Sequence, residues 1–293
     1  MINLINKESK VYKISKDKSN VSPFILTSPH SGTKYSKEFL NNSNRDFEDF
    51  KIVEDSFVNL LFDNSTQYGI AKLDSLISRV VIDLNRNVTD LDKTIIKGNL
   101  KNSNFSLSSY GRAGFGLIHN KTQSGNDIYK NKLSMRDVNY RINFFYYPWH
   151  NYLKKLIEES YVSFGFAFLL DCHSMPSITK SQNNNDFDFI IGNRFNSSCD
   201  NKIGNFIENY LSNKGYNVGF NMPYSGGYIT KNYGNKKNNI HALQLEISKD
   251  LYMNEKNFKR NKNFKKLKKD LDKLICDLSL FLKDSYLFKN VAE

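Results

Sequence analysis

The sequence predicts an α/β protein with a mixed, mainly parallel central sheet flanked by helices. Short apolar runs alternate along the chain with longer amphipathic segments, which is the order of strands and helices in this class. The clearest strand is the apolar run Phe164–Leu170, typical of a strand buried on both faces. With 293 residues, the chain can bury a sizeable core. No linker or internal repeat interrupts the pattern, so residues 1–293 are expected to form one domain.

The first half of the chain begins with a predicted strand, Phe24–Ser28, which ends at Pro29 because proline cannot donate to a strand ladder. A helix is expected from Val53 to Gln67, where apolar residues recur on one stripe. Leu73 and the residues Leu76–Leu84 predict the next strand, since the centre of that segment is β-branched. The polar residues 88–134 are expected to form a long loop or insertion, which in compact domains is often a lid or a binding segment.

The second half of the chain begins with a long helix, Arg136–Glu159, which Pro148 should kink or break. The remaining expected elements are a strand over Phe187–Ile191, a helix over Ile203–Leu211, a strand over Tyr216–Phe220, a glycine-rich loop over Ser225–Gly234, and a strand over His241–Ile247. Residues 256–287 predict a C-terminal amphipathic helix with a basic solvent face.

Composition narrows the class of protein. The formal net charge is +12, but the lysines are spread through loops and the last helix, so nucleic acid is not an expected partner. No segment has the roughly 20 apolar residues of a membrane span, and no membrane partner is expected. The start of the chain lacks the apolar core of a secretory signal, and three widely spaced cysteines indicate no disulfide framework. These features favour a cytoplasmic protein.

A first candidate for chemistry is the pair Asp171 and His173, which directly follows the apolar run. Residues two apart on a strand point to the same side, and Cys172 points to the other. In open α/β sheets, ligands bind beyond the carboxyl ends of the strands. An imidazole beside a carboxylate there suits a metal site or a general base, and it equally suits a hydrogen-bonded structural histidine.

Further polar residues stand near other predicted strands. His30 follows the first strand, and Asp55, in the first turn of a predicted helix, is either a cap or a metal ligand. Glu246 lies inside an apolar strand, where a glutamate needs a partner or a metal. It is therefore a candidate general base, with a structural ion pair as the alternative.

Two arginines, Arg79 and Arg86, bracket the β-branched segment, and an arginine fork is well suited to holding a carboxylate. His150, on the long helix, is a weaker candidate for lining the site, and His119 is expected to be solvated in the polar loop. The Gly226–Gly227 pair lacks a following Gly-Lys-Ser/Thr, so it predicts a flexible turn or lid and no phosphate-binding loop.

Seven segments of the chain, taken in order, resemble the N-formylglutamate amidohydrolase family. They are Ser28–Gly32, Glu54–Asp55 with Val58 and Leu60, Ser78–Arg86, Tyr147–His150, Asp171–Ser177, Gly226–Thr230 and His241–Glu246. The resemblance covers nearly the whole chain, from Phe24 to Met253. The run Asp83–Arg86 is also similar to the substrate-binding motif of aspartoacylases and related zinc carboxypeptidase-like enzymes.

The resemblance implies a phosphorylase/hydrolase-like fold and a zinc-dependent amidohydrolase. The implied small-molecule substrate is N-formyl-L-glutamate, cleaved to formate and L-glutamate. Carried onto this sequence, the Zn²⁺ ligands would be His30, Asp55 and His173, with Glu54 as the alternative to Asp55. Two histidines and one carboxylate leave a fourth tetrahedral position for water.

The resemblance also implies roles around the metal. Glu246 and Arg79 are the expected catalytic residues, and the expected substrate-binding residues are Asn85, Arg86, Gly227 and His150. One alternative is a related zinc amidase acting on another N-acyl amino acid or a small peptide. A second alternative, from a different class, is a non-catalytic relative that binds anions.

Overall fold

The computed structural model describes residues 3–5, 10–17, 22–98, 100, 103–177 and 186–287. The chain forms two compact units, each built from three separate segments. Unit 1 consists of Met1–Lys13, Pro29–Ser56 and Ser75–Tyr152. Unit 2 consists of Ile14–Ser28, Phe57–Asp74 and Leu153–Glu293. The expectation of a single domain over residues 1–293 stays a prediction.

A seven-stranded sheet with the order β2-β5-β3-β6-β9-β7-β8 has most of its residues in unit 2. Its strands are β2 (Tyr12–Ser15), β3 (Phe24–Ser28), β5 (Ala71–Ser75), β6 (Ala167–Met175), β7 (Phe189–Gly192), β8 (Val218–Phe220) and β9 (Ile240–Ser248). Strand β3 pairs in parallel with β5 and β6, and β6 pairs in parallel with β9. Strand β7 pairs in parallel with β8 and antiparallel with β9. The prediction of a mixed, mainly parallel sheet is therefore confirmed.

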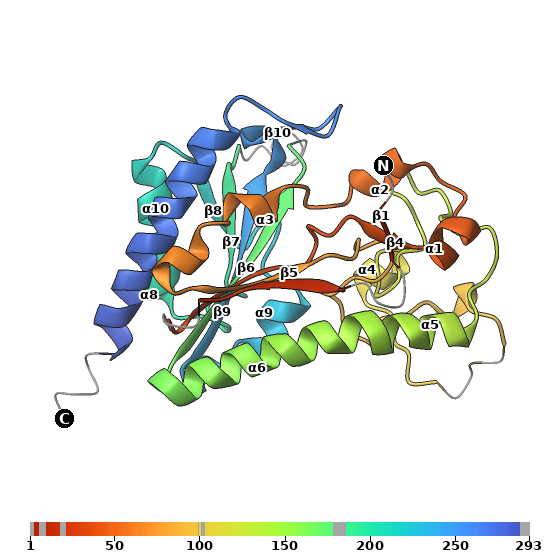
Figure 1. Ribbon diagram of the computed structural model, residues 1–293, viewed down its shortest axis with the longest axis horizontal. Helices are drawn as coiled ribbons and strands as arrows, with labels where there is room; N and C mark the ends of the chain where they lie inside the picture. The colour runs from red at the N-terminus through yellow and green to blue at the C-terminus, as the bar shows by residue number, and fades with distance from the viewer. Residues whose placement is uncertain are drawn as a thin grey trace. The chain divides into compact units, whose positions relative to one another are not determined.

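One face of this sheet packs against three helices of unit 2, as Figure 1 shows. These helices are α3 (Val58–Leu61), α8 (Asn201–Asn213) and α10 (Phe264–Leu282). Alternate residues of β6 and β9, such as Leu170, Cys172 and Leu245, enter this apolar core and are 0–1% exposed. Because side chains alternate along a strand, the residues between them, including Asp171 and His173, point to the other face.

Unit 1 is built from short helices and a small parallel ladder. Its elements are β1 (Asn3–Ile5), β4 (Lys34–Ser36), α1 (Lys37–Asn42), α2 (Phe47–Lys51), α4 (Ser109–Arg112) and α5 (Met135–Arg141). Its core contains Tyr35, Phe39 and Phe50, whose rings contact one another at 5.2–6.0 Å between centroids. The buried Arg141 donates to Asp137, to the Tyr129 hydroxyl and to the Val81 carbonyl, which satisfies its charge inside the unit.

The strand expected over Leu73 and Leu76–Leu84 is found at Leu73, which lies in β5, but the prediction is wrong over Leu76–Leu84. Strand β5 ends at Ser75, and the Val81 amide donates to the Ser78 carbonyl in a turn. The β-branched residues of this segment are buried in the core of the unit. A β-branched pattern indicates burial, but it does not show whether the buried residues lie in a strand or in a turn. The helix expected over Val53–Gln67 is also shorter, since it is divided into α3 and a 3-10 turn over Ser65–Tyr68.

The break expected at Pro148 is not found, since the helix continues through this residue. Helix α5 continues through a π-helical turn, Ile142–Tyr146, into α6 (Tyr147–Phe164). The Tyr147 amide donates five residues back to Ile142, so the hydrogen-bond pattern shifts just before the proline that cannot donate.

Two further boundaries differ from the prediction. The loop expected over Ser225–Gly234 contains helix α9 (Tyr228–Tyr233). The basic C-terminal helix starts at Phe264, because the preceding residues form a hairpin of β10 (Met253–Asn254) and β11 (Lys259–Arg260), and it ends in a π-helical turn over Lys283–Leu287.

The described part of segment 88–134 contains short helical turns and buried apolar residues despite its polar composition. It contains α4 and a 3-10 turn over Lys93–Ile95, and Leu117, Ile118 and Ile128 are 0–2% exposed. Asp90 accepts hydrogen bonds from the amide and hydroxyl of Ser108, which fixes the start of α4. Among the described residues of the whole chain, no helix combines the length and apolar character needed to cross a membrane.

Candidate active site

Asp171 and His173 lie inside β6, which continues to Met175, beyond the apolar run. His173 Nε2 is 2.8 Å from Asp171 Oδ2, and the Thr27 hydroxyl donates to Asp171 Oδ1 at 2.8 Å. All three side chains are at most 3% exposed. Because a carboxylate accepts, the hydrogen bond assigns the proton to His173 Nε2 and leaves Nδ1 as the basic nitrogen.

The neighbouring strand β9 carries Glu246 directly opposite His173. The two residues are Cα partners in the parallel ladder, and Asp171 is the partner of Gln244. Glu246 is 5% exposed, and its Oε1 accepts a hydrogen bond of 2.7 Å from Gln244 Nε2. Partners in a parallel ladder point to the same face of the sheet. A histidine and a buried carboxylate therefore share one face of two adjacent strands.

His30 and Asp55 lie in unit 1, in two turns that are locked together by backbone contacts. The Asp55 amide donates to the His30 carbonyl at 3.0 Å, and the Ser31 hydroxyl donates to the Asp55 carbonyl at 2.9 Å. The side chains approach as well, with 3.4 Å between His30 Nδ1 and Asp55 Oδ2. Both side chains are 2% exposed or less, so the pair is held away from bulk water.

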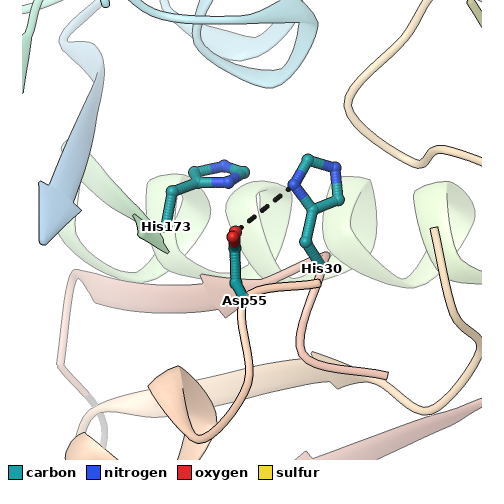
Figure 2. A group of neighbouring side chains, drawn as sticks. All are labelled: His30, Asp55 and His173. Carbon is teal, nitrogen blue, oxygen red and sulfur yellow. Dashed lines mark ion pairs between the residues drawn. The ribbon is translucent and has the colours of Figure 1, made fainter. Parts of the chain in front are cut away.

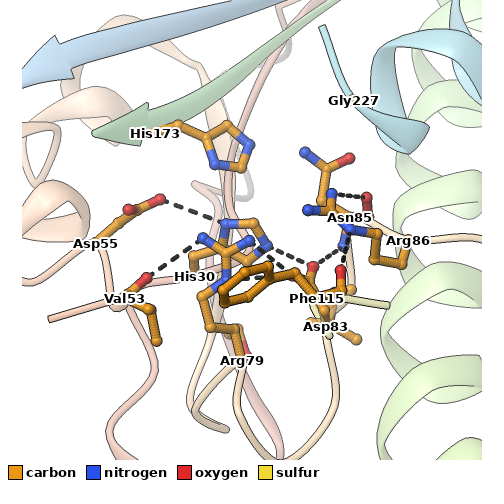
Figure 3. Close-up of polar contacts among 12 residues, drawn as sticks. His30, Val53, Asp55, Arg79, Asp83, Asn85, Arg86, Phe115, His173 and Gly227 are labelled. Atoms are coloured by element: carbon orange, nitrogen blue, oxygen red, sulfur yellow. Dashed lines mark hydrogen bonds and ion pairs between the residues drawn. The ribbon is translucent and has the colours of Figure 1, made fainter. Parts of the chain in front are cut away.

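Asp83 is a buried carboxylate that contacts His30 and several other polar side chains (Figure 3). Its Oδ1 is 2.7 Å from His30 Nε2, and its Oδ2 accepts from Arg79 at 2.7 and 3.1 Å and from His119 Nε2 at 3.1 Å. Burial alone would raise the pKa of Asp83, but Arg79, His30, Arg86 and His119 lower it well below its usual value. Asp83 is therefore an anionic acceptor that orients the His30 ring.

Glu54 points into a different environment from Asp55. Its Oε1 accepts hydrogen bonds from the Tyr35 hydroxyl, at 2.6 Å, and from the Ser78 hydroxyl. Burial and the nearby Glu54 raise the pKa of Tyr35, which keeps the phenol protonated as a donor. These contacts join the segment before Asp55 to the core of unit 1.

His30, Asp55 and His173 offer a set of ligand atoms that all lie within 4.8 Å of one another (Figure 2). Within unit 2, β3 and β6 are parallel neighbours with Thr27 opposite Asp171. His30 follows Thr27 by three residues and His173 follows Asp171 by two, so both lie toward the carboxyl ends of adjacent strands. Two imidazoles and one carboxylate are a donor set that suits a transition metal such as zinc.

Asn85 and Arg86 follow Asp83 in the same turn. The Asn85 amide donates to Asp83 Oδ1 at 2.8 Å. Arg86 is half-buried: its Nε donates to the Phe115 carbonyl and its Nη1 to the Asn85 carbonyl. The Tyr110 ring covers the guanidinium, with 4.4 Å from Cζ to the ring centroid. The segment around α4 thus holds Arg86 from two sides.

The structure places the weaker histidine candidates as follows. His119 is buried against Asp83, so the expectation that it is solvated is wrong; burial lowers its pKa to about 4. His150 is also buried, stacks 4.1 Å from the Tyr146 ring centroid, and donates from Nε2 to the Leu84 carbonyl at 2.9 Å. Burial likewise lowers the pKa of His150 to about 4, so both rings are neutral near pH 7.

Sequence reasoning missed three contacts at this site. They are the joining of His30 and His119 by Asp83, the stacking of Tyr110 on Arg86, and the position of Gln244 between Gly227 and Glu246. The polar Gln244 within an apolar run was a local signal that could have been used. The other two contacts join residues 24–53 positions apart, and no local pattern marks them.

Comparison with known proteins adds independent information. Residues 22–253 match the family model described as N-formylglutamate amidohydrolase. The chain is 28% identical over 240 residues to an N-formylglutamate deformylase from Pseudomonas putida, which covers 80% of this chain and 82% of the relative. It is 27% identical to an N-formylglutamate deformylase from Pseudomonas aeruginosa, with 80% and 83% covered.

A solved structure matches most of this chain. The crystal structure of an N-formylglutamate amidohydrolase from Ralstonia eutropha superposes with a TM-score of 0.88 and 29% sequence identity. The alignment covers 94% of this chain and 99% of that chain. The α/β fold of this chain is therefore closely similar to that of the solved structure.

Proposed function

Because the chain belongs to the N-formylglutamate amidohydrolase family, we propose that it hydrolyses N-formyl-L-glutamate to formate and L-glutamate at a bound metal ion. The names of the two Pseudomonas relatives and of the Ralstonia structure support this substrate. The observation that carries the proposal is the set of ligand atoms of His30, Asp55 and His173, which lie within 4.8 Å of one another.

The donor set fits Zn²⁺. Zinc bonds of about 2.1 Å at the tetrahedral angle separate two ligand atoms by about 3.4 Å. The distance between His30 Nδ1 and Asp55 Oδ2 is 3.4 Å. Each histidine contacts a buried carboxylate through Nε2, Asp83 for His30 and Asp171 for His173, so Nδ1 would be the nitrogen that holds the metal. Three protein ligands are the number that catalytic zinc sites use, leaving one position for water or substrate.

Asp55 is the carboxylate ligand that we propose. Its Oδ2 approaches His30, whereas Glu54 Oε1 accepts from the Tyr35 and Ser78 hydroxyls. A carboxylate that already accepts two hydrogen bonds in the core of unit 1 is well suited to anchoring the turn. Glu54 is therefore assigned to positioning its neighbour.

When bound, the metal ion would supply Lewis acidity toward the formyl carbonyl and toward water. Glu246 is the proposed general base, since it is a buried carboxylate paired in register with His173. It takes one proton from the attacking water as the C–O bond forms, and it returns that proton to the amine nitrogen as the C–N bond breaks. Formate and L-glutamate are then the two products.

The proposed substrate contacts come mainly from the turn after Asp83. Arg86 and Asn85 would hold a substrate carboxylate, because a guanidinium presents parallel donors in fixed geometry. Gly227 and His150 stay predicted contacts. Arg79 donates two hydrogen bonds to Asp83 and one to the Val53 carbonyl. We therefore propose that Arg79 holds Asp83 in position and takes no direct part in the reaction.

The test is formate release from N-formyl-L-glutamate by the purified protein, before and after chelation and after addition of Zn²⁺. Release that stops on chelation and returns with zinc is the expected result. Activity that persists through complete metal removal contradicts the metal proposal. Metal-loaded, folded protein that releases no formate contradicts the substrate, and the assay then extends to other N-acyl amino acids.

A further inference from the structure

Gln244 is a buried polar residue in the middle of β9, where its neighbours Leu243 and Leu245 enter the apolar core. Its Cα partners are Asp171 on β6 and Gly192 on β7. The side chain is 5% exposed. A carboxamide at such a position costs free energy unless its donor and acceptor are both satisfied, so its contacts identify its role.

The carboxamide joins a backbone turn to the proposed base. The Gly227 amide donates to Gln244 Oε1 at 2.8 Å, and Gln244 Nε2 donates to Glu246 Oε1 at 2.7 Å. A backbone N–H can only donate, so the oxygen of the carboxamide must face Gly227. The NH₂ group therefore faces Glu246, and a single side-chain orientation satisfies both neighbours.

The turn that Gln244 contacts is also held from β7. Gly192 leaves room for it, since a Cβ there would lie 2.7 Å from the Gly226 nitrogen. Arg194, which has a left-handed backbone conformation (φ 51°), donates from its amide to the Ser225 carbonyl and from Nη1 to the Gly226 carbonyl. A non-glycine residue in that conformation stores a small strain, which the surrounding contacts must offset.

We propose that Gln244 is a positioning residue that fixes the Glu246 carboxylate and couples it to the Gly226–Gly227 turn. This inference rests on the proposed function, in which Glu246 is the base and Gly227 contacts the substrate. The carboxamide then sets the distance between a substrate-contacting backbone and the group that moves the proton. A misplacement of about 1 Å in such a site lowers the rate by about a hundredfold.

Two substitutions separate the two hydrogen bonds. Gln244→Glu keeps an oxygen that can accept from the Gly227 amide, but it removes the donor to Glu246 and places a second carboxylate beside it. Gln244→Met has a similar length and removes both hydrogen bonds. Leu245→Met is the matched control, because it alters the same strand on the opposite face and conserves volume.

The variants are expected to differ in kcat and KM. Gln244→Glu lowers kcat by about tenfold to a hundredfold with little change in KM, because only the base is displaced. Gln244→Met lowers kcat and also raises KM, because the turn loses its acceptor. Leu245→Met keeps both constants within about twofold of the unmodified enzyme. Metal content and thermal unfolding are measured for all three.

Hydrogen exchange at Gly227 gives a readout that does not depend on activity. Its backbone amide should exchange faster in Gln244→Met than in the unmodified protein, and stay protected in Gln244→Glu. Unchanged exchange in Gln244→Met, or kcat within about threefold of the unmodified enzyme in both folded, metal-loaded variants, overturns the proposal. If the unmodified protein cleaves no N-formyl amino acid, the proposed function fails, whereas exchange at Gly227 still decides whether Gln244 holds the turn.

Discussion

His173 and Glu246 are Cα partners in the parallel ladder between β6 and β9. Their side chains leave the same face of the sheet, so backbone pairing sets the spacing between a proposed metal ligand and the proposed base. Both strands are nine residues long, and β6 is buried along its whole length. Placement on buried strands is more precise than placement on loops, which favours a catalytic constellation at this point.

The first prediction concerns Glu246. Glu246→Gln should lower kcat by about 10²–10⁴-fold, because an amide of the same shape cannot accept the proton of the attacking water. The Gln244 contact at 2.7 Å involves only an accepting oxygen, which glutamine retains, so folding and metal content should not change. Formate release and bound metal are measured on the same sample. Near-normal turnover in the variant would exclude Glu246 as the base.

The sequence predicts the parts of the site that lie on strong local patterns. Strand Phe24–Ser28 is found with the expected bounds. His30, Asp55 and His173 are the ligand set that the family resemblance implies, and they form a candidate metal-binding group. Buried strands have unmistakable apolar runs, and the carboxyl ends of parallel neighbours share one edge of a sheet.

The rest depends on packing between segments distant in the sequence. The β-branched residues near Val81 predicted a strand, but they fill the core of unit 1 from a turn. His119 lies in a polar segment, and it is buried with Asp83, 36 residues earlier, as its hydrogen-bond partner. Such pairings are set by tertiary contacts, which override local preference.

The second prediction concerns Asp83, which contacts His30 at 2.7 Å. Asp83→Asn should weaken metal binding by about 10- to 100-fold, because the His30 ring loses the charged acceptor that orients it. The metal dissociation constant is measured by competition with a chelator. Arg112→Lys, an exposed change in unit 1, is the control. An unchanged dissociation constant would show that Asp83 does not serve the metal ligand.

The third prediction tests Arg86 as the carboxylate clamp. Arg86→Lys should raise KM for N-formyl-L-glutamate by about tenfold or more, because an ammonium replaces two parallel donors with one point charge. The effect on the corresponding diamide, which has no carboxylate, should be much smaller. An equal rise in KM for the two substrates would contradict the proposal that Arg86 binds the substrate carboxylate.

The fourth prediction concerns Tyr110, whose ring lies 4.4 Å from Arg86 Cζ. Tyr110→Ala should raise KM for N-formyl-L-glutamate by about two- to fivefold, because an exposed cation–π contact contributes about 0.5–1 kcal/mol. Tyr110→Phe keeps the ring face and should behave like the unmodified enzyme. If Tyr110→Phe raises KM as much as Tyr110→Ala does, the hydroxyl is the important group and the stacking argument is wrong.

The fifth prediction concerns stability at low pH. Burial lowers the pKa of His119, His150 and His241 to about 4 from the ordinary 6.5. A histidine with a depressed folded-state pKa favours folding while it is neutral. Its contribution is therefore complete above pH 6.5 and declines as the pH falls toward 4, where the unfolded chain binds more protons.

His241 is the histidine of choice for this test, because its Nδ1 accepts from the Asp200 amide and it contacts no proposed metal ligand among the described residues. Between pH 6 and 5, His241→Gln should reduce the dependence of unfolding free energy on pH by up to about 1.4 kcal/mol per pH unit, the effect of one proton. Urea unfolding is measured at several pH values with a chelator present, so that metal binding does not contribute its own pH dependence. A slope identical to that of the unmodified protein would mean that His241 is protonated in the folded state as readily as in the unfolded chain.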